Sequence, residues 1–298
     1  MGNSSTLPKQ AILIVNTASR NGSNSFEDAH DKLISAGVDL IDALAVNDPD
    51  DLPRKVRTAV DKAPMVIVGG GDGTLSEVVD HFLGTGCVFA LLPLGTANSF
   101  ARSLGIPLDI GGAVDVVANG EARQIDLAAI DGDYFLNNAA LGLAPKVAES
   151  VPHGIKRYLG RAGYLLWAGW SAANFRAFRL ILDDGRAVHR LWATEARIAN
   201  GRFHGGVELI ESAQLESGDI VVQAVEGHSL LKLGWSYAAS ILKHPSRHQT
   251  VREFRGKRLR VDTRPRMRVS IDGELGPETP FEVAVAPRAI SVAAPRTG

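Results

Sequence analysis

The feature that most constrains this chain is a run of glycines directly after an apolar segment. Residues 65–77 read MVIVGGGDGTLSE, so four glycines fall within five positions. The order predicts a buried strand, a tight turn and a helix that opens behind the turn. Thr74 and Glu77 have the spacing of a capping box, so we expect Thr74 to start this helix.

The turn has the composition of a phosphate-binding loop. Glycines lack a Cβ, so backbone N–H groups can close on a phosphate chain, and the helix N-terminus adds partial positive charge. Asp72 would repel phosphate unless a divalent cation lies between them. The loop has neither the Lys of a Walker A motif nor the spacing of a dinucleotide-binding GxGxxG. The alternative is a turn without a ligand, but four glycines and an Asp favour phosphate binding.

A second loop repeats this arrangement further along the chain. Residues 88–92 (VFALL) predict a strand, followed by the loop 93–99 (PLGTANS) and a helix from about Phe100. If the two strands are parallel neighbours, both loops emerge at the same carboxyl edge of the sheet, where open α/β sheets bind ligands. We therefore expect the two loops to form one nucleotide site.

The first 120 residues alternate short β-rich runs with helical patterns. The pattern predicts strands at 11–15, 38–46, 65–68 and 88–92, and helices at about 26–36, 50–62, 74–83 and 98–104. Strands that alternate with helices imply crossover connections. The prediction is therefore a doubly wound parallel sheet covered on both faces.

The pattern then changes to strand-like runs separated by turns. The turn signals are Asp131-Gly132, 183–185 (DDG), 217–219 (SGD) and Asp272-Gly273, and helical interruptions are predicted at about 156–178 and 228–242. We therefore expect an α/β domain over residues 1–124 and a mainly antiparallel β domain over residues 125–288. An apolar run within residues 289–298 predicts a last strand, which could return to the first domain.

Composition narrows the function classes. A net charge of −1 over 298 residues gives no global case for nucleic-acid binding. The single Cys87 excludes an intramolecular disulfide and a multi-cysteine metal site, which fits a reducing cytoplasm. The eight His residues show no ligand-like spacing. No stretch approaches the roughly 18 apolar residues that cross a bilayer, so we expect a cytoplasmic protein. The oligomeric state is not indicated.

The sequences GGGDGTLSE (69–77) and PLGTANSFARSLGIP (93–107) resemble the diacylglycerol kinase catalytic domain, in the bacterial lipid-kinase branch related to sphingosine kinases. The similarity extends over roughly residues 11–295. Its further matching positions are Asn16, Asp126, Phe135-Leu136-Asn137, Gly142, Asn200, Gly205-Gly206 and the DGE motif Asp272-Gly273-Glu274. The resemblance implies a nucleotide-binding α/β domain, a β-rich lipid-substrate domain, and an active site in the cleft between them.

Carried over position by position, the resemblance implies a kinase that uses ATP and Mg²⁺ to phosphorylate a lipid hydroxyl. Glu274 or Asp272 would accept the hydroxyl proton, and Asp72 would lie near the catalytic Mg²⁺ that enters with ATP. The residues expected to hold ATP are Asn16, Thr17, Ser19, Arg20, Gly70, Gly71, Asp72, Gly73, Thr74, Leu75, Ser76, Gly95, Thr96 and Asn98. From the residues alone, Asp272-Gly273 is also the signature of a plain hairpin turn.

Thr17 replaces the Pro that is usual after Asn16 in the family, and two further departures matter more. Ser99 stands where the second loop usually has Asp, and Ser217 precedes Gly218 where an Asp-Gly pair is usual. In the family the latter Asp helps to hold a structural Mg²⁺. We therefore expect this accessory site to be absent or altered, with Leu215, Glu216 and Asp219 as the residues around its position.

Two segments predict peripheral contact with a membrane, where a lipid substrate would be met. Residues 243–268 hold ten Lys or Arg against Glu253 and Asp262, and such clusters are attracted to anionic headgroups. The alternative is the solvent face of a strand. The segment 158–178, with Tyr164 and Trp167, reads as an interfacial helix or as ordinary core.

Two other functions stay open at this point. NAD kinases share a GGDG loop on a related fold, so the substrate could be a soluble molecule. The Ser residues at 99 and 217 also allow a catalytically weak regulator that binds nucleotide or lipid. The GTANSFAR helix and the DGE motif favour the lipid kinase.

Overall fold

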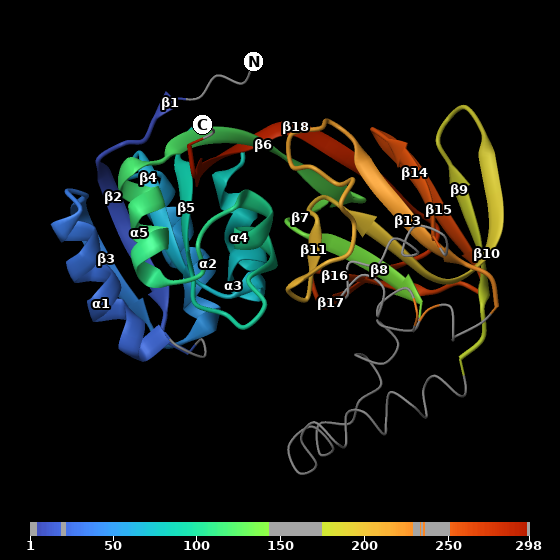
Figure 1. Cartoon of the computed structure of the whole chain (residues 1–298), viewed down its shortest axis with the longest axis horizontal. Coiled ribbons are helices and arrows are strands. Elements are labelled where there is room, and N and C mark those ends of the chain that lie inside the picture. The colour runs from blue at the N-terminus through green and yellow to red at the C-terminus, as the bar shows by residue number, and fades with distance from the viewer. Residues whose placement is uncertain are drawn as a thin grey trace, which may run out of the picture.

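The computed structural model describes residues 5–18, 22–142, 175–228, 233, 235 and 251–296. It has an α/β unit formed by the first part of the chain and a β-rich unit formed by the rest (Figure 1). The predicted fold class is therefore confirmed. Two long strands, β6 (Glu121–Ile130) and β18 (Phe281–Ala294), run from one unit into the other (Figure 1).

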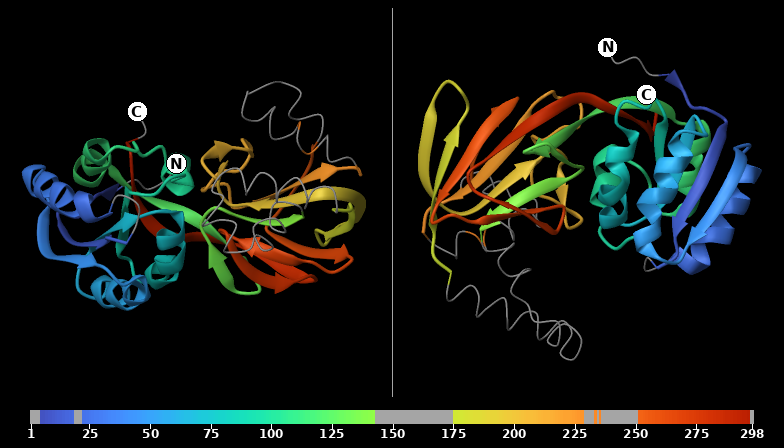
Figure 2. Two further views of the ribbon diagram at one scale, coloured as in Figure 1. Left: turned by 90° about the horizontal axis from the view of Figure 1, so that it is seen from below. Right: turned by 180° about the vertical axis from the view of Figure 1, so that it is seen from behind.

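The sheet of the α/β unit is parallel, as predicted. Its strands are β3 (Asp39–Val46), β2 (Gln10–Asn16), β4 (Met65–Gly70) and β5 (Val88–Pro93), in that spatial order. Every residue of β4 and β5 is buried, because helices cover both faces of the sheet. Helices α1 (Gly22–Ser35) and α5 (Ile110–Asn119) lie on one face, and α2 (Leu52–Val60) lies on the other with α3 (Asp72–Val78) (Figure 2).

Two helical details differ from the expectations. Helix α3 begins at Asp72 after the extended residue Gly71, so the capping box that would start it at Thr74 is wrong. The helix begins two residues before Thr74 because β4 ends at Gly70 and Gly71 is the N-cap. Helix α5 was not predicted, since its valines and glycines are poor helix formers. It forms because the Asp109 carboxylate accepts a hydrogen bond from Gly112 N at 2.8 Å and because its apolar face packs on β5.

The remaining helices of this unit are short. A 3₁₀ turn, η1 (Pro49–Asp51), precedes α2, and a second, η2 (Val79–Phe82), follows α3. Helix α4 (Ser99–Leu104) follows the second glycine loop, and Gly105 ends it in the left-handed conformation that favours glycine.

The β-rich unit is antiparallel and encloses its own apolar core. Its predicted turns at 131–132, 185, 218 and 272–273 contain residues with positive φ. The strands are β7 (Asp133–Phe135), β8 (Asn138–Gly142), β9 (Phe178–Asp183), β10 (Val188–Ala199), β11 (Phe203–His204), β12 (Val207–Glu208), β13 (Ile220–Glu226), β14 (Val251–Gly256), β15 (Arg258–Arg264), β16 (Arg268–Ile271) and β17 (Glu274–Glu278).

The two long strands β6 and β18 pair with each other in antiparallel fashion. The first part of β18 pairs with β15 of the β-rich unit. Its end pairs in parallel with β5, where Ser291 lies opposite Val88. The end of the last strand therefore extends the first sheet beyond β5. A short strand, β1 (Ser5–Thr6), pairs with the start of β6.

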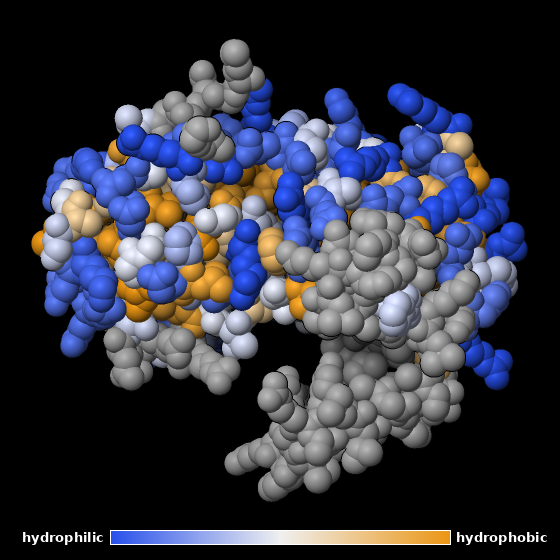
Figure 3. Space-filling model, in the orientation of Figure 1, coloured by the Kyte–Doolittle hydropathy of each residue, from blue (hydrophilic) through white to orange (hydrophobic). Residues whose placement is uncertain are grey.

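Several sequence predictions fall partly on residues that are not described. Of the helix predicted over about 156–178, residues 156–174 lie outside the described residues. Residues 175–177 are not helical, and Phe178 is the first residue of β9. The helix predicted over about 228–242 lies almost wholly outside them. Within the basic stretch, Arg258, Arg260 and Arg264 of β15 point to solvent while alternate residues are buried. Hydrophilic side chains predominate at the β-rich end of the face in Figure 3. Among the described helices, none has the length and apolar character to span a bilayer.

Candidate active site

The two glycine loops meet at the carboxyl edge of the first sheet. Strands β4 and β5 are parallel neighbours, with Gly70 opposite Pro93. A Cβ on Gly95 would lie 2.6 Å from the Gly71 Cα, so the two backbones approach each other too closely for any side chain. The two loops therefore meet at one edge of the sheet, as predicted, and a nucleotide site there stays a prediction. The contact also explains why glycine stands at both positions.

Asn98 gives the second loop its shape. This residue has a positive φ of 48°. Its side-chain oxygen accepts a hydrogen bond from Gly95 N at 2.9 Å, and its Nδ2 donates to the backbone oxygens of Pro93 and Gly95 at 3.3 and 3.1 Å. The Asn98 amide therefore holds the loop that Thr96 belongs to.

The loop after β2 joins the same edge. Asn16 Nδ2 donates to Thr74 Oγ1 at 3.0 Å, and Asn16 Oδ1 accepts from Ala18 N at 3.0 Å. Thr17 donates its hydroxyl to the Val46 oxygen at 2.9 Å, which fixes the loop to β3. Asn16 thus links a third loop to the start of α3. Ser19 and Arg20, also predicted here, lie outside the described residues.

Asp72 connects the two glycine loops. Its carboxylate accepts hydrogen bonds from Ser99 N at 2.9 Å and Phe100 N at 3.0 Å, which are the first N–H groups of α4. A carboxylate at this place stabilises the helix start by satisfying two N–H groups that have no acceptor within the helix. The acidic residue that was unexpected in a phosphate loop thus has a structural role. Its predicted contact with Mg²⁺ stays a prediction.

The β-rich unit contacts the second loop through the β11–β12 hairpin. Gly206 N donates to Ser99 Oγ at 3.1 Å. A Cβ on Gly206 would lie 3.3 Å from the Ala97 oxygen, and Gly205 and Gly206 both have positive φ. The hairpin tip can lie this close to the loop only because it is built from glycine. Ser99, the residue that departs from the family pattern, makes this contact as an acceptor.

A second contact between the units joins Ser76 to Asp272. The Asp272 carboxylate accepts the Ser76 hydroxyl at 2.7 Å and the backbone N–H groups of residues 136–138 at 2.9, 3.1 and 3.0 Å. Burial raises the pKa of Asp272, and these four hydrogen bonds oppose the rise. Asp272 and Gly273 have positive φ and form the turn between β16 and β17. The predicted turn is therefore confirmed, and the role of the motif as the general base stays a prediction.

Glu274 lies beside α3 in a pocket of about 200 Å³. The pocket is also lined by Gly73, Ser76 and Glu77, so the DGE motif and the first glycine loop share one space. Burial, and then the charge of Glu274, raise the pKa of Glu77. In contrast to Asp272, the Glu274 side chain is exposed.

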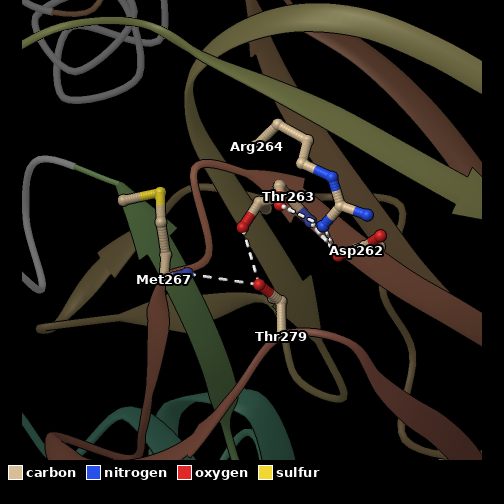
Figure 4. Close-up of polar contacts among 5 residues, drawn as sticks. All are labelled: Asp262, Thr263, Arg264, Met267 and Thr279. Carbon is tan, nitrogen blue, oxygen red and sulfur yellow. Dashed lines mark hydrogen bonds and ion pairs between the residues drawn. The ribbon is translucent and has the colours of Figure 1, made fainter.

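The hairpin that carries the DGE motif is held at its base by two buried threonines (Figure 4). The hydroxyls of Thr263 and Thr279 are 2.7 Å apart, and Thr279 Oγ1 accepts from Met267 N at 3.2 Å. Thr279 N in turn donates to the Met267 oxygen at 3.0 Å. Sequence reasoning missed these contacts, because no local pattern distinguishes them from ordinary strand residues.

His204 stands directly before the glycine tip of the β11–β12 hairpin, and sequence reasoning did not single it out. Its Nδ1 contacts Asn138 Oδ1, and Asn138 Nδ2 donates to the Phe203 oxygen at 3.2 Å. Burial lowers the pKa of His204, and the charge of Asp72 is among those that act on it. The only available signal was its position directly before Gly205-Gly206.

The region of the expected accessory metal site is tied together by backbone contacts. Asp126 Oδ2 accepts from Gly218 N at 2.6 Å, and Asp126 Oδ1 accepts from Arg288 N at 2.9 Å. Glu216 forms an ion pair with Arg123 at 3.5 Å. Within the described part of the chain, no group of three or more His, Cys, Asp or Glu side chains is placed to hold a metal ion.

Comparison with known families agrees with this architecture. Residues 10–130 match the diacylglycerol kinase catalytic domain, and residues 138–294 match the YegS C-terminal NAD kinase beta sandwich-like domain. Fold and site thus define a two-domain kinase in which a β sandwich follows an α/β catalytic domain. The chain belongs to the family that carries the YegS C-terminal NAD kinase beta sandwich-like domain, and a match to the diacylglycerol kinase catalytic domain precedes this domain.

Individual relatives agree with this family. A diacylglycerol kinase of Staphylococcus aureus (strain bovine RF122 / ET3-1) is 28% identical over 96% of this chain and 93% of its own length. One of Staphylococcus haemolyticus (strain JCSC1435) is 28% identical over 78% of this chain and 71% of its own. A solved structure of a diacylglycerol kinase from Bacillus anthracis str. Sterne has a TM-score of 0.76 at 21% identity and covers 97% of this chain and 98% of its own, which supports the fold.

Proposed function

We propose that this protein transfers the γ-phosphoryl group of Mg-ATP to a hydroxyl group of a lipid, of the diacylglycerol or sphingoid type. One observation carries the proposal. Gly71, which precedes α3, contacts Gly95 of the second loop, and Ser76 of α3 is hydrogen-bonded to Asp272 of the DGE motif. Both glycine loops and the acidic motif therefore border one interface between the units. Phosphoryl transfer needs this combination of positioning and electrostatics.

The loops fit a polyphosphate. Nothing lies within 4 Å of the position that a Cβ on Gly73 would take, so a phosphate chain can approach the first loop at the start of α3. Mg²⁺ would enter bound to phosphate oxygens and water, since the described residues assemble no dedicated carboxylate cluster. When bound, it neutralises charge on the phosphates. Asp72 is the carboxylate within the loop that would lie near it, because each of its oxygens keeps a second lone pair.

The two acids of the DGE motif have different roles in this proposal. Asp272 is saturated by four donors, so it positions the turn and joins the units. Glu274 is exposed in the pocket next to Gly73 and Ser76, so its carboxylate is the one that a lipid hydroxyl can reach. A general base at that position contributes about 10²- to 10⁴-fold to the rate.

The substrate class rests on the first domain. The β sandwich itself is of the NAD kinase-like kind, so it does not separate a lipid from a soluble substrate. The match of residues 10–130 to the diacylglycerol kinase catalytic domain favours the lipid. We further propose that the enzyme meets its substrate as a peripheral protein, with outward arginines such as Arg258 and Arg260 near anionic headgroups.

Incubation with γ-labelled ATP and Mg²⁺ tests the proposal. The acceptors are mixed micelles of a diacylglycerol, a sphingoid base, a prenol or phosphatidylglycerol, with NAD as the soluble acceptor. We expect label in a lipid and none in NAD. Glu274→Gln should lower kcat about 10²- to 10⁴-fold, whereas Glu278→Gln, on the same strand and exposed, should retain it. Label in NAD alone, or an unchanged rate for Glu274→Gln, would overturn the assignment.

A further inference from the structure

A larger pocket lies at the opposite end of α4 from the second glycine loop. Its volume is about 510 Å³, within the range of small-molecule sites. It is lined by residues 102–105 of the α/β unit, by Arg123 of β6, and by residues between 202 and 216 of the β-rich unit. None of these residues belongs to the glycine loops or to the pocket of Glu274. The kinase reaction proposed above therefore makes no use of this pocket.

Three partly buried arginines line it, and each is held in place by a backbone carbonyl. Arg102 Nε donates to the Ala97 oxygen at 3.0 Å, and Arg202 Nε donates to the Ala213 oxygen at 3.2 Å. Arg123 Nη2 donates to the Pro295 oxygen at 2.8 Å. A guanidinium fixed along one edge keeps its other N–H groups in a defined direction. Such a planar fork matches the oxygens of a phosphate group.

These arginines have few anionic partners in the described part of the chain. Neither Arg102 nor Arg202 forms an ion pair there, and the buried Nε of Arg123 makes no hydrogen bond. Arg123 lies 3.9 Å from Glu121 and 3.5 Å from Glu216, whose side chain is 49% exposed. The Glu216 contact is long and exposed, so it contributes little stability and a bound anion can replace it.

The acidic side chains at the pocket do not cancel this charge. Glu208 and Glu216 line it together with the three arginines, which leaves a net charge of +1. Phe203, Leu104 and Leu215 supply apolar wall between the charged groups. This lining suits a small organic phosphate rather than a bare metal ion or a neutral molecule.

We propose that this pocket is a second ligand site, which binds a phosphate-bearing group through Arg102, Arg123 and Arg202. The phosphate belongs either to a soluble phosphomonoester or to the headgroup of an anionic phospholipid. Occupancy acts on the second glycine loop, because Arg102 is bonded to Ala97 of that loop. The hairpin that follows Arg202 also contacts this loop, through Gly206 and Ser99.

The first test measures the rise in thermal unfolding temperature with inorganic phosphate and with glycerol 3-phosphate. Nucleotide and lipid acceptor are left out, so the result does not depend on kinase activity. Sodium chloride at equal ionic strength is the blank. We expect a rise in the wild type, and at least roughly tenfold weaker binding in the variant Arg123→Gln/Arg202→Gln, which loses charge-assisted hydrogen bonds. Arg190→Gln, an exposed arginine of β10, is the matched control and should keep the wild-type response.

A second variant covers the case in which the double substitution fails to fold. Gln214 is exposed at the pocket, so Gln214→Glu adds a negative charge without disturbing a core. It should weaken phosphate binding roughly 3- to 10-fold. Phosphate can also enter the glycine loops, which these substitutions leave intact. A phosphate response of wild-type size in both variants would therefore place the anion at the loops and overturn the proposal.

A sedimentation assay distinguishes the two sources of the phosphate. The wild type and the variants are mixed with phosphatidylcholine vesicles that contain or lack phosphatidylglycerol. If the pocket variants lose the response to soluble phosphate but still sediment with anionic vesicles, the ligand is a soluble phosphomonoester. If they also lose binding to anionic vesicles, the pocket holds a lipid headgroup. Variants that match the wild type in both assays refute the site.

Discussion

Replacement of Asp272 by Asn separates the two acids of the DGE motif. The Asp272 carboxylate accepts hydrogen bonds through both oxygens: Oδ1 from the N–H groups of Asn137 and Asn138, and Oδ2 from Leu136 N and the Ser76 hydroxyl. Asn has one carbonyl oxygen and one amino group. With its oxygen at the Oδ1 position, its amino group would face Leu136 N at about the present 2.9 Å, a donor against a donor.

The cost follows from this geometry. The Leu136 N–H group would then lose its acceptor. Because Leu136 is fully buried, water cannot replace that acceptor, and the loss costs about 1–3 kcal/mol. The remaining bonds become neutral, and charge-assisted bonds are roughly twice as strong. Removal of a partly desolvated charge offsets part of this loss. We therefore expect Asp272→Asn to lower the free energy of unfolding by about 2–3 kcal/mol and to lower activity as well.

Urea unfolding followed by circular dichroism, together with kcat, is the assay. Glu274→Gln should change the unfolding free energy by less than about 0.5 kcal/mol, because the side chain is exposed, while activity falls. In a double-mutant cycle, the effect of Ser76→Ala should shrink when Asn is at position 272, since the neutral amide weakens the bond that Ser76→Ala removes. An inactive Asp272→Asn with wild-type stability would refute the reasoning and make Asp272 the base.

Three further predictions follow from single residues. A Cβ at Gly95 would lie 2.6 Å from the Gly71 Cα. Gly95→Ala should therefore lower the free energy of unfolding, measured with a chemical denaturant, by about 1–3 kcal/mol and weaken ATP binding. Gly73→Ala is the control, because open space surrounds its Cβ position and stability should be retained. Burial lowers the pKa of His204 below its ordinary 6.5. As the pH falls below 6.5 the unfolded chain therefore takes up the proton first, and the folded state loses stability. In His204→Gln, the difference in unfolding free energy between about pH 7.5 and pH 5.5 should be smaller. Burial raises the pKa of Cys87 to about 12, so a thiol reagent such as DTNB at about pH 8 should label it only upon unfolding, and rapid labelling of the native protein would contradict this.

The sequence predicted those parts of the fold that local pattern controls. Apolar runs located β2, β4 and β5, because strands buried on both faces leave a continuous apolar signal. The meeting of the two glycine loops was predictable too, since parallel neighbouring strands end at one edge. Helix α5 was not, because its formation depends on packing against β5 rather than on the helix propensity of its valines.

The cross-connections of the site could not be predicted in the same way. Asp72 caps a helix that begins 27 positions later in the chain, and Ser99 accepts from Gly206 across 107 positions. The first contact depends on how two loops of the α/β unit lie, and the second on how the two units are placed, and no sequence period encodes either arrangement. For Asp272 the turn pattern was visible, but not that the turn would direct its carboxylate at the N–H groups of residues 136–138.

The geometry around Ser99 bears on whether the departures from the family pattern weaken the enzyme. Ser99 supplies an oxygen acceptor to Gly206 N, a contact that needs no negative charge. The carboxylate that the start of α4 requires comes instead from Asp72, through Ser99 N and Phe100 N. A serine at this position therefore keeps the hairpin on the loop and the helix capped. Because loop, helix and hairpin are all maintained with Ser present, Ser99 does not by itself argue for an inactive nucleotide-binding regulator. The groups proposed for phosphoryl transfer, Asp72 and Glu274, remain in the places where the loops and the DGE turn hold them.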